Sequence, residues 1–485
     1  SFLPMENDEM NTQYEDAIDL PLEALHDLSH RLTGTIVTPA DEEYGGARTI
    51  WNAMIASRPA AIAFPETTRD VAALIRFAVA ERLPLAIRGG GHNIAGSALA
   101  DGGLTIHMGR MKSVDYDATT GRVRVGAGAT WADVDAALEP FGLIVPGGVV
   151  STTGVAGFTL GGGFGWLTRS EGYTSERLTA ATIVTADGQI REIDAFNEPD
   201  LFWAIRGGGG NFGVVTSFEF EPVRLGPEIA GGVVFWPIER APEIIDLFRR
   251  ESAAAPAELT HVLVLRIAPP APFLPEEFHG KPIVGIAAMY AGPVDEGIAA
   301  LEPIMTYGEP LANTIKPKPY REHQAFLDSG QPFGRRYYWK SVYFDDFSDG
   351  VKDALLAYGT SFRSPFSSIL LPHLGGVGTR DADEATATSH RGREFLVSYQ
   401  ASWEDPNLDT HLIDWARENH ASLMPFATGH YVNFMTEDEI RDPARAAFEP
   451  ALLARLQQIK AIYDPANVFR LNKNITPAEV LSPGS

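Results

Sequence analysis

The 485-residue sequence contains no cysteine. This absence excludes disulfides, thiolate metal ligands and cysteine nucleophiles, and it agrees with a cytoplasmic protein. The sequence also lacks a run of about eighteen apolar residues, which a membrane-spanning helix would need. Its first residues are acidic and show no basic flank followed by an apolar stretch, so no signal peptide is visible. We therefore expect a cytoplasmic protein with no membrane partner; the alternative is a secreted protein whose signal peptide has been cleaved.

The chain has fewer basic residues than acidic ones. The chain has 39 lysine and arginine residues against 63 aspartate and glutamate residues, which gives a net charge of −24. Proteins that bind the phosphate backbone of nucleic acids need a basic face that displaces counterions. We therefore expect no nucleic-acid partner, and a small molecule as the substrate.

Several common functional motifs are missing. There is no phosphate loop ending in Gly-Lys-Ser/Thr, and no G-x-G-x-x-G follows a strand with an acidic residue about twenty positions later. Ser97 follows Gly96 but lies in no G-x-S-x-G elbow, which argues against a serine hydrolase. His26 and His30 have the spacing of zinc ligands on a helix, but no glutamate follows His26 as in H-E-x-x-H. We expect no metal site.

The length predicts two domains, because single domains usually span about 100–200 residues. Residues 1–225 alternate short apolar runs, glycine-rich turns and helical patterns, as an α/β domain does. Residues 226–429 are richer in proline clusters and contain strand-like stretches, which indicates a second domain. From residue 430 to 485 the pattern changes again, and we expect this tail to return to the first domain.

Two helices can be predicted in detail. One is capped by Thr130, ends at Gly142, and has a buried face formed by Trp131, Val134, Leu138 and Phe141. The other lies in the tail, before the Asp464-Pro465 break, with a buried face formed by Leu452, Leu456, Ile459 and Ile462.

Three glycine-rich segments are the most unusual feature: Arg88–Asn93, Gly147–Gly165 and Arg206–Gly213. Glycine leaves backbone N–H groups open to close approach, and such surfaces bind pyrophosphate without basic side chains. The alternative is that each segment is only a tight turn. His92 directly follows three glycines, which would let a planar ring system come close to its imidazole.

The order of these segments resembles one known family. The chain resembles the FAD-linked oxidases of the vanillyl-alcohol oxidase superfamily, which have a PCMH-type FAD-binding domain, and within them the berberine-bridge-enzyme-like branch. The resemblance covers nearly the full length. The matching segments are Tyr44–Asn52, Arg88–Asn93, Ser151–Trp166, Asp200–Val215, His390-Arg391, Trp403, Tyr431–Phe434, Tyr463–Phe469 and Leu471–Ile475.

The resemblance implies an α+β fold: an FAD-binding domain of two α/β subdomains, closed by the tail, and a substrate domain whose antiparallel sheet, flanked by helices, roofs the flavin. It implies covalent FAD, joined through an 8α-histidyl bond to His92. Many relatives add a second bond through a cysteine at the position of Val150, so attachment here is expected to be single, as in the 6-hydroxynicotine-oxidase-like members. The implied cofactor-binding residues are Arg88, Gly89, Gly90, Gly91, His92, Asn93, Gly96, Ser97, Gly148, Ser151, Thr152, Thr153, Gly154, Gly157, Phe158, Gly165, Gly213, Val214, Val215 and Asn472.

The catalytic position departs from the family pattern. The usual catalytic tyrosine ends a Y-x-N-Y motif, and Phe434 stands in its place. Because a phenyl ring cannot take a proton, Tyr431 and Asn433 are the remaining catalytic candidates of this motif. If the segment is a strand, alternation puts Phe434 on the opposite side from both.

Three further residues are catalytic candidates, each with a plainer alternative. Glu171 falls where relatives have an aromatic residue or histidine, so it is either a general base near the flavin or a surface-loop residue. Gln400 aligns roughly with the glutamate base of the berberine bridge enzyme, so it either orients the substrate or is an ordinary strand residue. Lys340 lies in a segment that often lines the substrate face, or it is a snorkelling surface lysine.

The resemblance therefore implies an FAD-dependent oxidoreductase. The expected reaction is that of an oxidase, which removes hydride from a C–H next to an alcohol or amine and passes the electrons to O2. Two alternatives stay open: a flavin-binding protein without oxidase chemistry, or a dehydrogenase with another acceptor. The pattern of the second domain identifies neither the substrate nor the oligomeric state.

Overall fold

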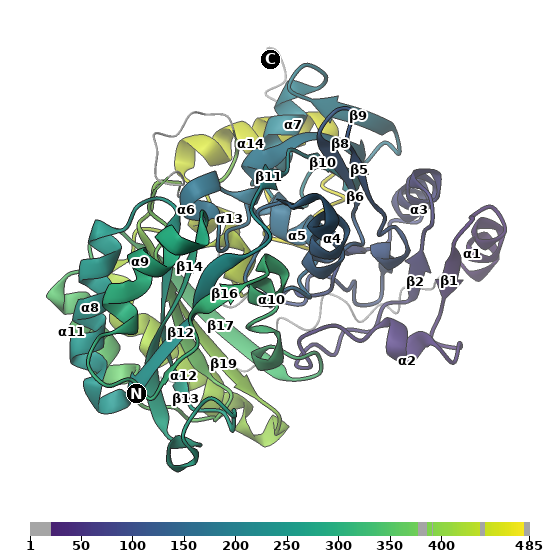
Figure 1. Cartoon of the computed structure of the whole chain (residues 1–485). Helices are drawn as coiled ribbons and strands as arrows, with labels where there is room; N and C mark the ends of the chain where they lie inside the picture. The colour runs from purple at the N-terminus through teal and green to yellow at the C-terminus, as the bar shows by residue number, and fades with distance from the viewer. Residues whose placement is uncertain (1–20, 377–385, 390, 437–441, 480–485) are drawn as a thin grey trace.

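The first part of the chain, residues 22–224, forms two main sheets (Figure 1). In the first, β2, β4 and β3 are parallel neighbours and β1 is antiparallel at the edge. Its strands are β1 (Thr35–Val37), β2 (Ala61–Phe64), β4 (Leu104–His107) and β3 (Leu85–Arg88). The second sheet is antiparallel and contains β5 (Val114–Asp117), β6 (Arg122–Gly126), β10 (Val214–Phe220), β8 (Leu178–Val184) and β9 (Ile190–Asp194). A short pair, β7 (Leu143–Ile144) with β11 (Val223–Arg224), leads into the second part.

The structure is a computed structural model and describes residues 21–376, 386–389, 391–436 and 442–479. His390, one of the residues that carry the family resemblance, lies outside the described residues.

Five helices of the first part share one hydrophobic core with these sheets: α1 (Leu22–Ser29), α3 (Thr68–Ala80), α4 (Trp131–Leu138), α5 (Val155–Leu160) and α7 (Pro199–Ile205). The short helices α2 (Tyr44–Ala47) and α6 (Thr168–Glu171) contribute no residue to this core. Helix α4 begins after Thr130, whose side chain accepts a hydrogen bond from the backbone N–H of Asp133. The helix ends at Leu138, earlier than predicted, and Gly142, in the left-handed region with φ of 62°, ends the 3-10 turn that follows it. The prediction for Phe141 is wrong: its side chain is 48% exposed, because a 3-10 turn over Glu139–Phe141 rotates it away from the core.

The second part of the chain, residues 229–423, is built on one large antiparallel sheet. Its strands, in spatial order, are β15 (Ala312–Asn313), β12 (Ile229–Pro237), β14 (Pro282–Tyr290), β13 (Leu259–Ile267), β18 (Ser368–Pro372), β19 (Phe395–Trp403) and β17 (Arg336–Phe344), and β16 (Lys316–Lys318) also pairs with β12. Helices α8 (Ala241–Ala254), α9 (Val294–Met305), α11 (Asp349–Tyr358) and α12 (Asp409–Leu423) cover one face (Figure 1). The short helix α10 (Tyr320–Gln324) lies near α4 of the first part.

Alternation along the strands separates the two faces of this sheet. On β13, Leu263 and Leu265 are buried in the core shared with the helices, whereas Val262 and Val264 belong to a cluster that includes Trp166 of the first part. The face of the sheet opposite α8, α9, α11 and α12 therefore points toward the first part of the chain. The predicted α+β class, with a large antiparallel sheet flanked by helices, is confirmed.

The tail returns to the first core through α13 (Pro443–Ala447) and α14 (Pro450–Tyr463). On α14, Leu456 and Ile459 are buried as predicted, but Ile462 is 67% exposed, and Leu453 is buried instead. None of the helices formed by the described residues has the length and apolar character needed to cross a bilayer.

Candidate functional site

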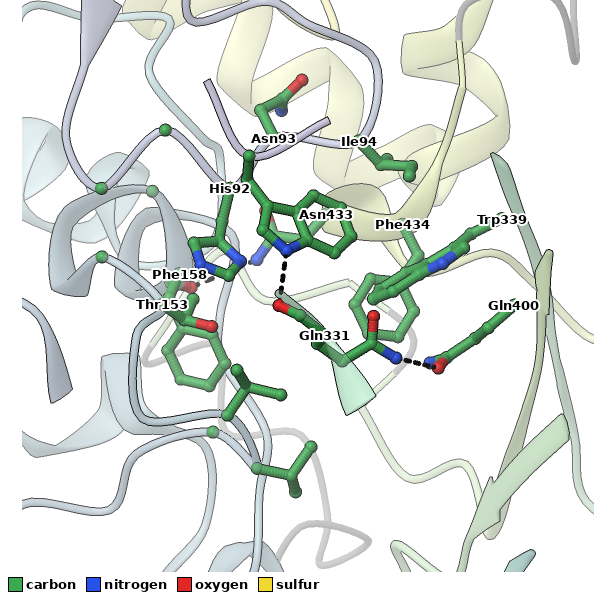
Figure 2. Close-up of a pocket in the computed structure, with 18 of the residues that line it drawn as sticks. His92, Asn93, Ile94, Thr153, Phe158, Gln331, Trp339, Gln400, Asn433 and Phe434 are labelled. Atoms are coloured by element: carbon green, nitrogen blue, oxygen red, sulfur yellow. Dashed lines mark hydrogen bonds between the residues drawn. The ribbon is translucent and has the colours of Figure 1, made fainter. Parts of the chain in front are cut away.

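A cavity of about 740 Å³ lies between the glycine-rich loops and the face of the large sheet opposite α8, α9, α11 and α12. This volume is within the range of small-molecule and cofactor sites. Figure 2 shows His92 and Thr153 on one side and Trp339 and Gln400, from β17 and β19, on the other. The predicted cofactor-binding residues that line the wall are Gly89, Gly90, Gly91, His92, Asn93, Ser97, Gly148, Thr153, Gly154, Gly157, Phe158, Gly213 and Asn472.

The glycines let two loops of the wall touch. A Cβ atom on Gly154 would lie 2.3 Å from the backbone nitrogen of Gly90, and one on Gly90 would lie 2.5 Å from the nitrogen of Gly154. No larger residue fits at either position without moving the backbone. Around Gly157 and Gly210, by contrast, no described atom lies within 4 Å of the Cβ position, although both glycines line the cavity. Their main chain is therefore open to a bound molecule.

His92 is held in one orientation on the wall. Its Nε2 atom lies 3.0 Å from the hydroxyl of Thr152, and its ring stacks on Trp51 with the centroids 5.0 Å apart. Burial lowers the pKa of His92 to about 4. The imidazole is therefore neutral at pH 7, which leaves a lone pair on one ring nitrogen.

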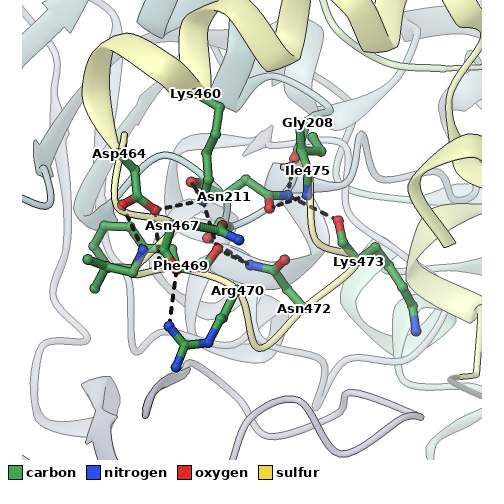
Figure 3. Close-up of polar contacts among 12 residues, drawn as sticks. Gly208, Asn211, Lys460, Asp464, Asn467, Phe469, Arg470, Asn472, Lys473 and Ile475 are labelled. Atoms are coloured by element: carbon green, nitrogen blue, oxygen red, sulfur yellow. Dashed lines mark hydrogen bonds and ion pairs between the residues drawn. The ribbon is translucent and has the colours of Figure 1, made fainter. Parts of the chain in front are cut away.

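The tail supplies another part of the wall, through Phe469, Leu471, Asn472 and Lys473. The fully buried Lys460 holds this segment in place (Figure 3). Its ammonium donates to the carboxylate of Asp464 at 2.6 Å, to the carbonyl of Asn211 at 2.7 Å and to the carbonyl of Phe469 at 2.9 Å.

Asn472 is positioned by this arrangement. Its Nδ2 atom donates to the carbonyl of Gly210 at 3.1 Å, whereas its buried Oδ1 has no hydrogen-bond partner among the described residues. A buried acceptor without a donor favours a ligand N–H at this position.

Other predicted cofactor-binding residues lie behind the wall. Thr152 contacts His92, the backbone N–H and hydroxyl of Ser151 bind the carboxylate of Asp328 at 2.8 and 2.5 Å, and Arg88 donates to the carbonyl of Ala47 at 2.8 Å. The remaining four are buried or tightly packed: Gly96, Gly165, Val214 and Val215. These residues support the loops and strands that form the wall.

The segment with Tyr431, Asn433 and Phe434 is a 3-10 turn over Val432–Phe434, not a strand. The predicted separation of Phe434 from Tyr431 is therefore wrong, because residues three apart on such a turn share a side. The two rings meet edge to face with centroids 5.0 Å apart. All three residues line the cavity, and Figure 2 shows Asn433 and Phe434 there. The amide of Asn433 donates to the hydroxyl oxygen of Tyr431 at 2.9 Å.

Of the two candidates on the large sheet, only one reaches the cavity. Gln400 lines it and accepts a hydrogen bond from the amide of Gln331 at 2.9 Å (Figure 2). Lys340 follows Trp339 on β17 and therefore points to the opposite face, where its ammonium donates to the hydroxyl of Thr436 at 3.0 Å. The prediction that Lys340 faces the substrate is wrong, and so is the alternative of a surface residue, because only 3% of it is exposed.

Glu171 also lies away from the cavity. It ends α6 and forms an ion pair with Arg177, and its side chain is 27% exposed. Its role as a base near the flavin is not supported, since its carboxylate is already neutralised outside the wall.

Sequence reasoning missed four residues that line the cavity but lie in separate segments of the sequence. Trp51, Gln331, Trp339 and Arg266 all line the cavity. The signal for Arg266 was present, because in Leu259–Ile267 it has the same parity as Val262 and Val264 in an otherwise apolar strand. Among the described residues, no aspartate or glutamate lines the cavity.

Comparisons with known proteins agree with this geometry. An FAD binding domain model matches residues 59–194, and a "berberine and berberine like" model matches residues 430–476. An FAD-linked oxidoreductase of Dictyostelium discoideum is 30% identical, over 94% of this chain and 97% of its own length. The (R)-6-hydroxynicotine oxidase of Paenarthrobacter nicotinovorans is 26% identical, over 92% and 97% respectively. The crystal structure of 6-hydroxy-D-nicotine oxidase from Arthrobacter nicotinovorans superposes with a TM-score of 0.82 at 26% identity, covering 92% of this chain and 98% of that one.

The cavity fits the cofactor of these relatives. FAD carries a pyrophosphate, which open glycine main chain can bind. Its flavin ring also carries an N–H group, from which the buried Oδ1 of Asn472 can accept a hydrogen bond. The two family models and the full-length similarity lead to one conclusion: the chain belongs to the berberine-bridge-enzyme-like FAD-linked oxidoreductases, and its cofactor is FAD.

Proposed function

We propose that this enzyme is an oxidase that holds FAD through one covalent bond to His92 and removes hydride from a C–H next to an amine or alcohol of a small molecule. Bound FAD supplies the two-electron acceptor, and O2 then takes the electrons. We also propose the domain division at residues 225 and 429, with the tail from 430 completing the FAD-binding domain.

The observation that carries the covalent link is the state of His92. Its imidazole is neutral, lies in the cavity wall, and is fixed between Trp51 and Thr152. A neutral, oriented imidazole is the form that can act as a nucleophile toward a ring system beside it. The chain has no cysteine that could add a second attachment.

Acid denaturation followed by peptide mapping tests the link. We expect the yellow chromophore to remain with the peptide that contains His92, and the His92→Ala variant to release all its flavin into the supernatant. His26→Ala is the matched control, because His26 lies exposed on α1 and away from the cavity. Flavin released by acid from the unaltered protein would contradict the covalent assignment.

Proton handling falls to Tyr431 and its neighbours. Burial raises the pKa of Tyr431, although the amide of Asn433 and the backbone N–H groups of Gly163 and Phe164 favour its ionised form. Tyr431 therefore remains protonated at pH 7 and serves to bind and orient a polar group of the substrate. With no carboxylate in the described wall, the site suits a substrate whose oxidised group needs no strong base, such as a neutral amine.

Anaerobic mixing with panels of amines and alcohols tests the reaction. We expect bleaching of the flavin absorption by an amine, and then consumption of one O2 for each H2O2 formed when air is admitted. Bleaching without subsequent O2 consumption would support a dehydrogenase with another acceptor.

A flavin-binding protein without oxidase chemistry is the second candidate, and Phe434 favours it, because the family tyrosine is absent. That protein would stay yellow with every amine and alcohol tried. Phe434→Tyr would then be expected to gain activity.

A further inference from the structure

Four polar or aromatic side chains form one row across the sheet that closes the cavity. Arg266 of β13 pairs with Ser368 of β18, Ser368 pairs with Gln400 of β19, and Gln400 pairs with Trp339 of β17. All four line the cavity. Since neighbouring strands lie about 4.8 Å apart, the row extends about 14 Å from the guanidinium end to the indole end. One elongated molecule could contact the whole row.

The positive charge of Arg266 is not neutralised by an ion pair with any described residue. Its Nε atom donates to the carbonyl of Ile267 at 3.1 Å, but no carboxylate among the described residues pairs with its guanidinium. The nearby Arg335 is already used: it forms an ion pair with Glu404 at 3.5 Å and stacks on Phe366 at 4.0 Å. Burial, and next the charge of Arg335, lower the pKa of Arg266, yet an arginine remains protonated at pH 7.

This cation lies on a cavity wall that carries no negative charge among the described residues. The chain carries a net charge of −24, and an arginine on a cavity wall without aspartate or glutamate among the described residues is desolvated for no structural gain. A half-buried guanidinium that faces a cavity binds carboxylates in a forked geometry with two hydrogen bonds. The hydroxyl of Ser368, its direct neighbour in the row, donates a long hydrogen bond of 3.4 Å to Oε1 of Gln400, and by rotating it would donate to the same carboxylate instead.

The Trp339 end of the row carries aromatic rings and hydrogen-bonding groups without a partner among the described residues. The indole N–H of Trp339 and the Oε1 of Gln331 are buried and have no hydrogen-bond partner among the described residues. Trp339 meets Phe434 edge to face at 5.2 Å, and Phe434 in turn meets Tyr431. This end therefore combines an aromatic wall with one free donor and one free acceptor, close to Tyr431.

We propose that the substrate of this oxidoreductase is a flat, elongated molecule with a carboxylate at one end, which Arg266 and Ser368 bind, and the oxidised amine or alcohol at the other end, near Trp339 and Tyr431. This proposal rests on the proposed function and adds the substrate class to it. An apolar body between the two ends would lie along Val264, Leu370 and Phe366, which line the same cavity.

Matched ligand pairs test the assignment without turnover. The flavin-loaded enzyme is titrated with a series of aromatic carboxylates of increasing length, and with the carboxamide of each, while the flavin absorption and the tryptophan fluorescence are recorded. We expect the best carboxylate to bind at least roughly tenfold more tightly than its carboxamide, as a charge-assisted hydrogen bond predicts.

Variants of Arg266 locate the effect. Arg266→Met, which keeps the unbranched stem, should remove the preference for carboxylate and leave carboxamide binding within about twofold, and Arg266→Lys should restore part of it. Arg110→Met is the control, because Arg110 pairs with Glu66 on the surface. The proposal is overturned if no carboxylate of the series binds more tightly than its carboxamide, or if Arg266→Met binds both as the unaltered enzyme does.

The two proposals fail in different ways. Bleaching by amines that is unaffected by Arg266→Met would leave the oxidase assignment standing and remove the carboxylate end. Selective binding of carboxylates by an enzyme that no amine or alcohol bleaches would do the reverse.

Discussion

Replacing Asp135 by asparagine should stabilise the protein, and the gain should grow with pH. Asp135 lies on α4, is 3% exposed, and neither of its carboxyl oxygens has a hydrogen-bond partner among the described residues. Burial raises its pKa from 3.8 to about 8, with smaller contributions from the opposing charge of Arg321 and the like charges of Glu139 and Asp328. The folded protein therefore keeps this carboxyl protonated at neutral pH.

The size of the effect follows from proton linkage. Between about pH 4 and pH 8 the unfolded chain has lost the proton of Asp135 while the folded chain retains it. The free energy of unfolding therefore falls as pH rises, by about 1.4 kcal/mol per pH unit, and the loss is complete above the folded pKa. An asparagine side chain at this position would resemble the protonated carboxyl in size and charge but would not titrate. The Asp135→Asn variant should match the unaltered protein at pH 4 and exceed it by about 5 kcal/mol at pH 8.

Thermal unfolding of the flavin-loaded enzyme in steps from pH 4.5 to 8.5 measures this difference. For a chain of this length the entropy of unfolding makes 1 kcal/mol equivalent to about 1 °C. The two Tm curves should diverge by about 1.4 °C per pH unit, whereas Asp115→Asn, an exposed control on β5, should run parallel to the unaltered protein. Parallel curves for the Asp135 variant would refute the reasoning, because they would mean that Asp135 ionises alike in both states.

Three other outcomes are expected. Lys460→Met should lower the free energy of unfolding by about 3–5 kcal/mol and lower the fraction of protein that carries flavin, because it leaves a buried carboxylate unpaired beneath Asn472; an unchanged Tm in calorimetry would contradict this. Gly154→Ala should reduce the ratio of flavin to protein absorption, because its methyl group would collide with the backbone of Gly90, and a normal ratio would disprove the need for close loops. Glu171→Gln should change kcat by less than about twofold, since the residue lies outside the cavity; a loss of more than tenfold would return it to the catalytic group.

Local features were predictable from the sequence because their causes are local. The Thr130 cap of α4 depends on neighbouring residues, and the structure has it, whereas Gly142 ends the 3-10 turn that follows α4 rather than α4 itself. Most of the glycines in the three clusters and His92 lie on the cavity wall, since open main chain is useful only where something approaches it. The antiparallel sheet and its helices were predicted by resemblance rather than by pattern.

The predictions that failed depended on register and on distant partners. Lys340 is one residue from the cavity face of β17, and a single step along a strand reverses the side chain. Phe434 shares a side with Tyr431 because tertiary packing formed a 3-10 turn where a strand was assumed. The row from Arg266 to Trp339 exists only through pairing of strands that are far apart in sequence, which no local pattern reveals.

The return of the tail to the first core determines when the enzyme can become active in the cell. Gly89 and Lys473 line the same cavity, and Leu456 and Ile459 of α14 complete the hydrophobic core that begins at α1. A ribosome adds about 5–20 residues per second, so the early half of the chain waits some tens of seconds for these partners. The complete cavity wall therefore forms only after the last residues have left the ribosome, which makes full contact with the flavin a late event of biosynthesis.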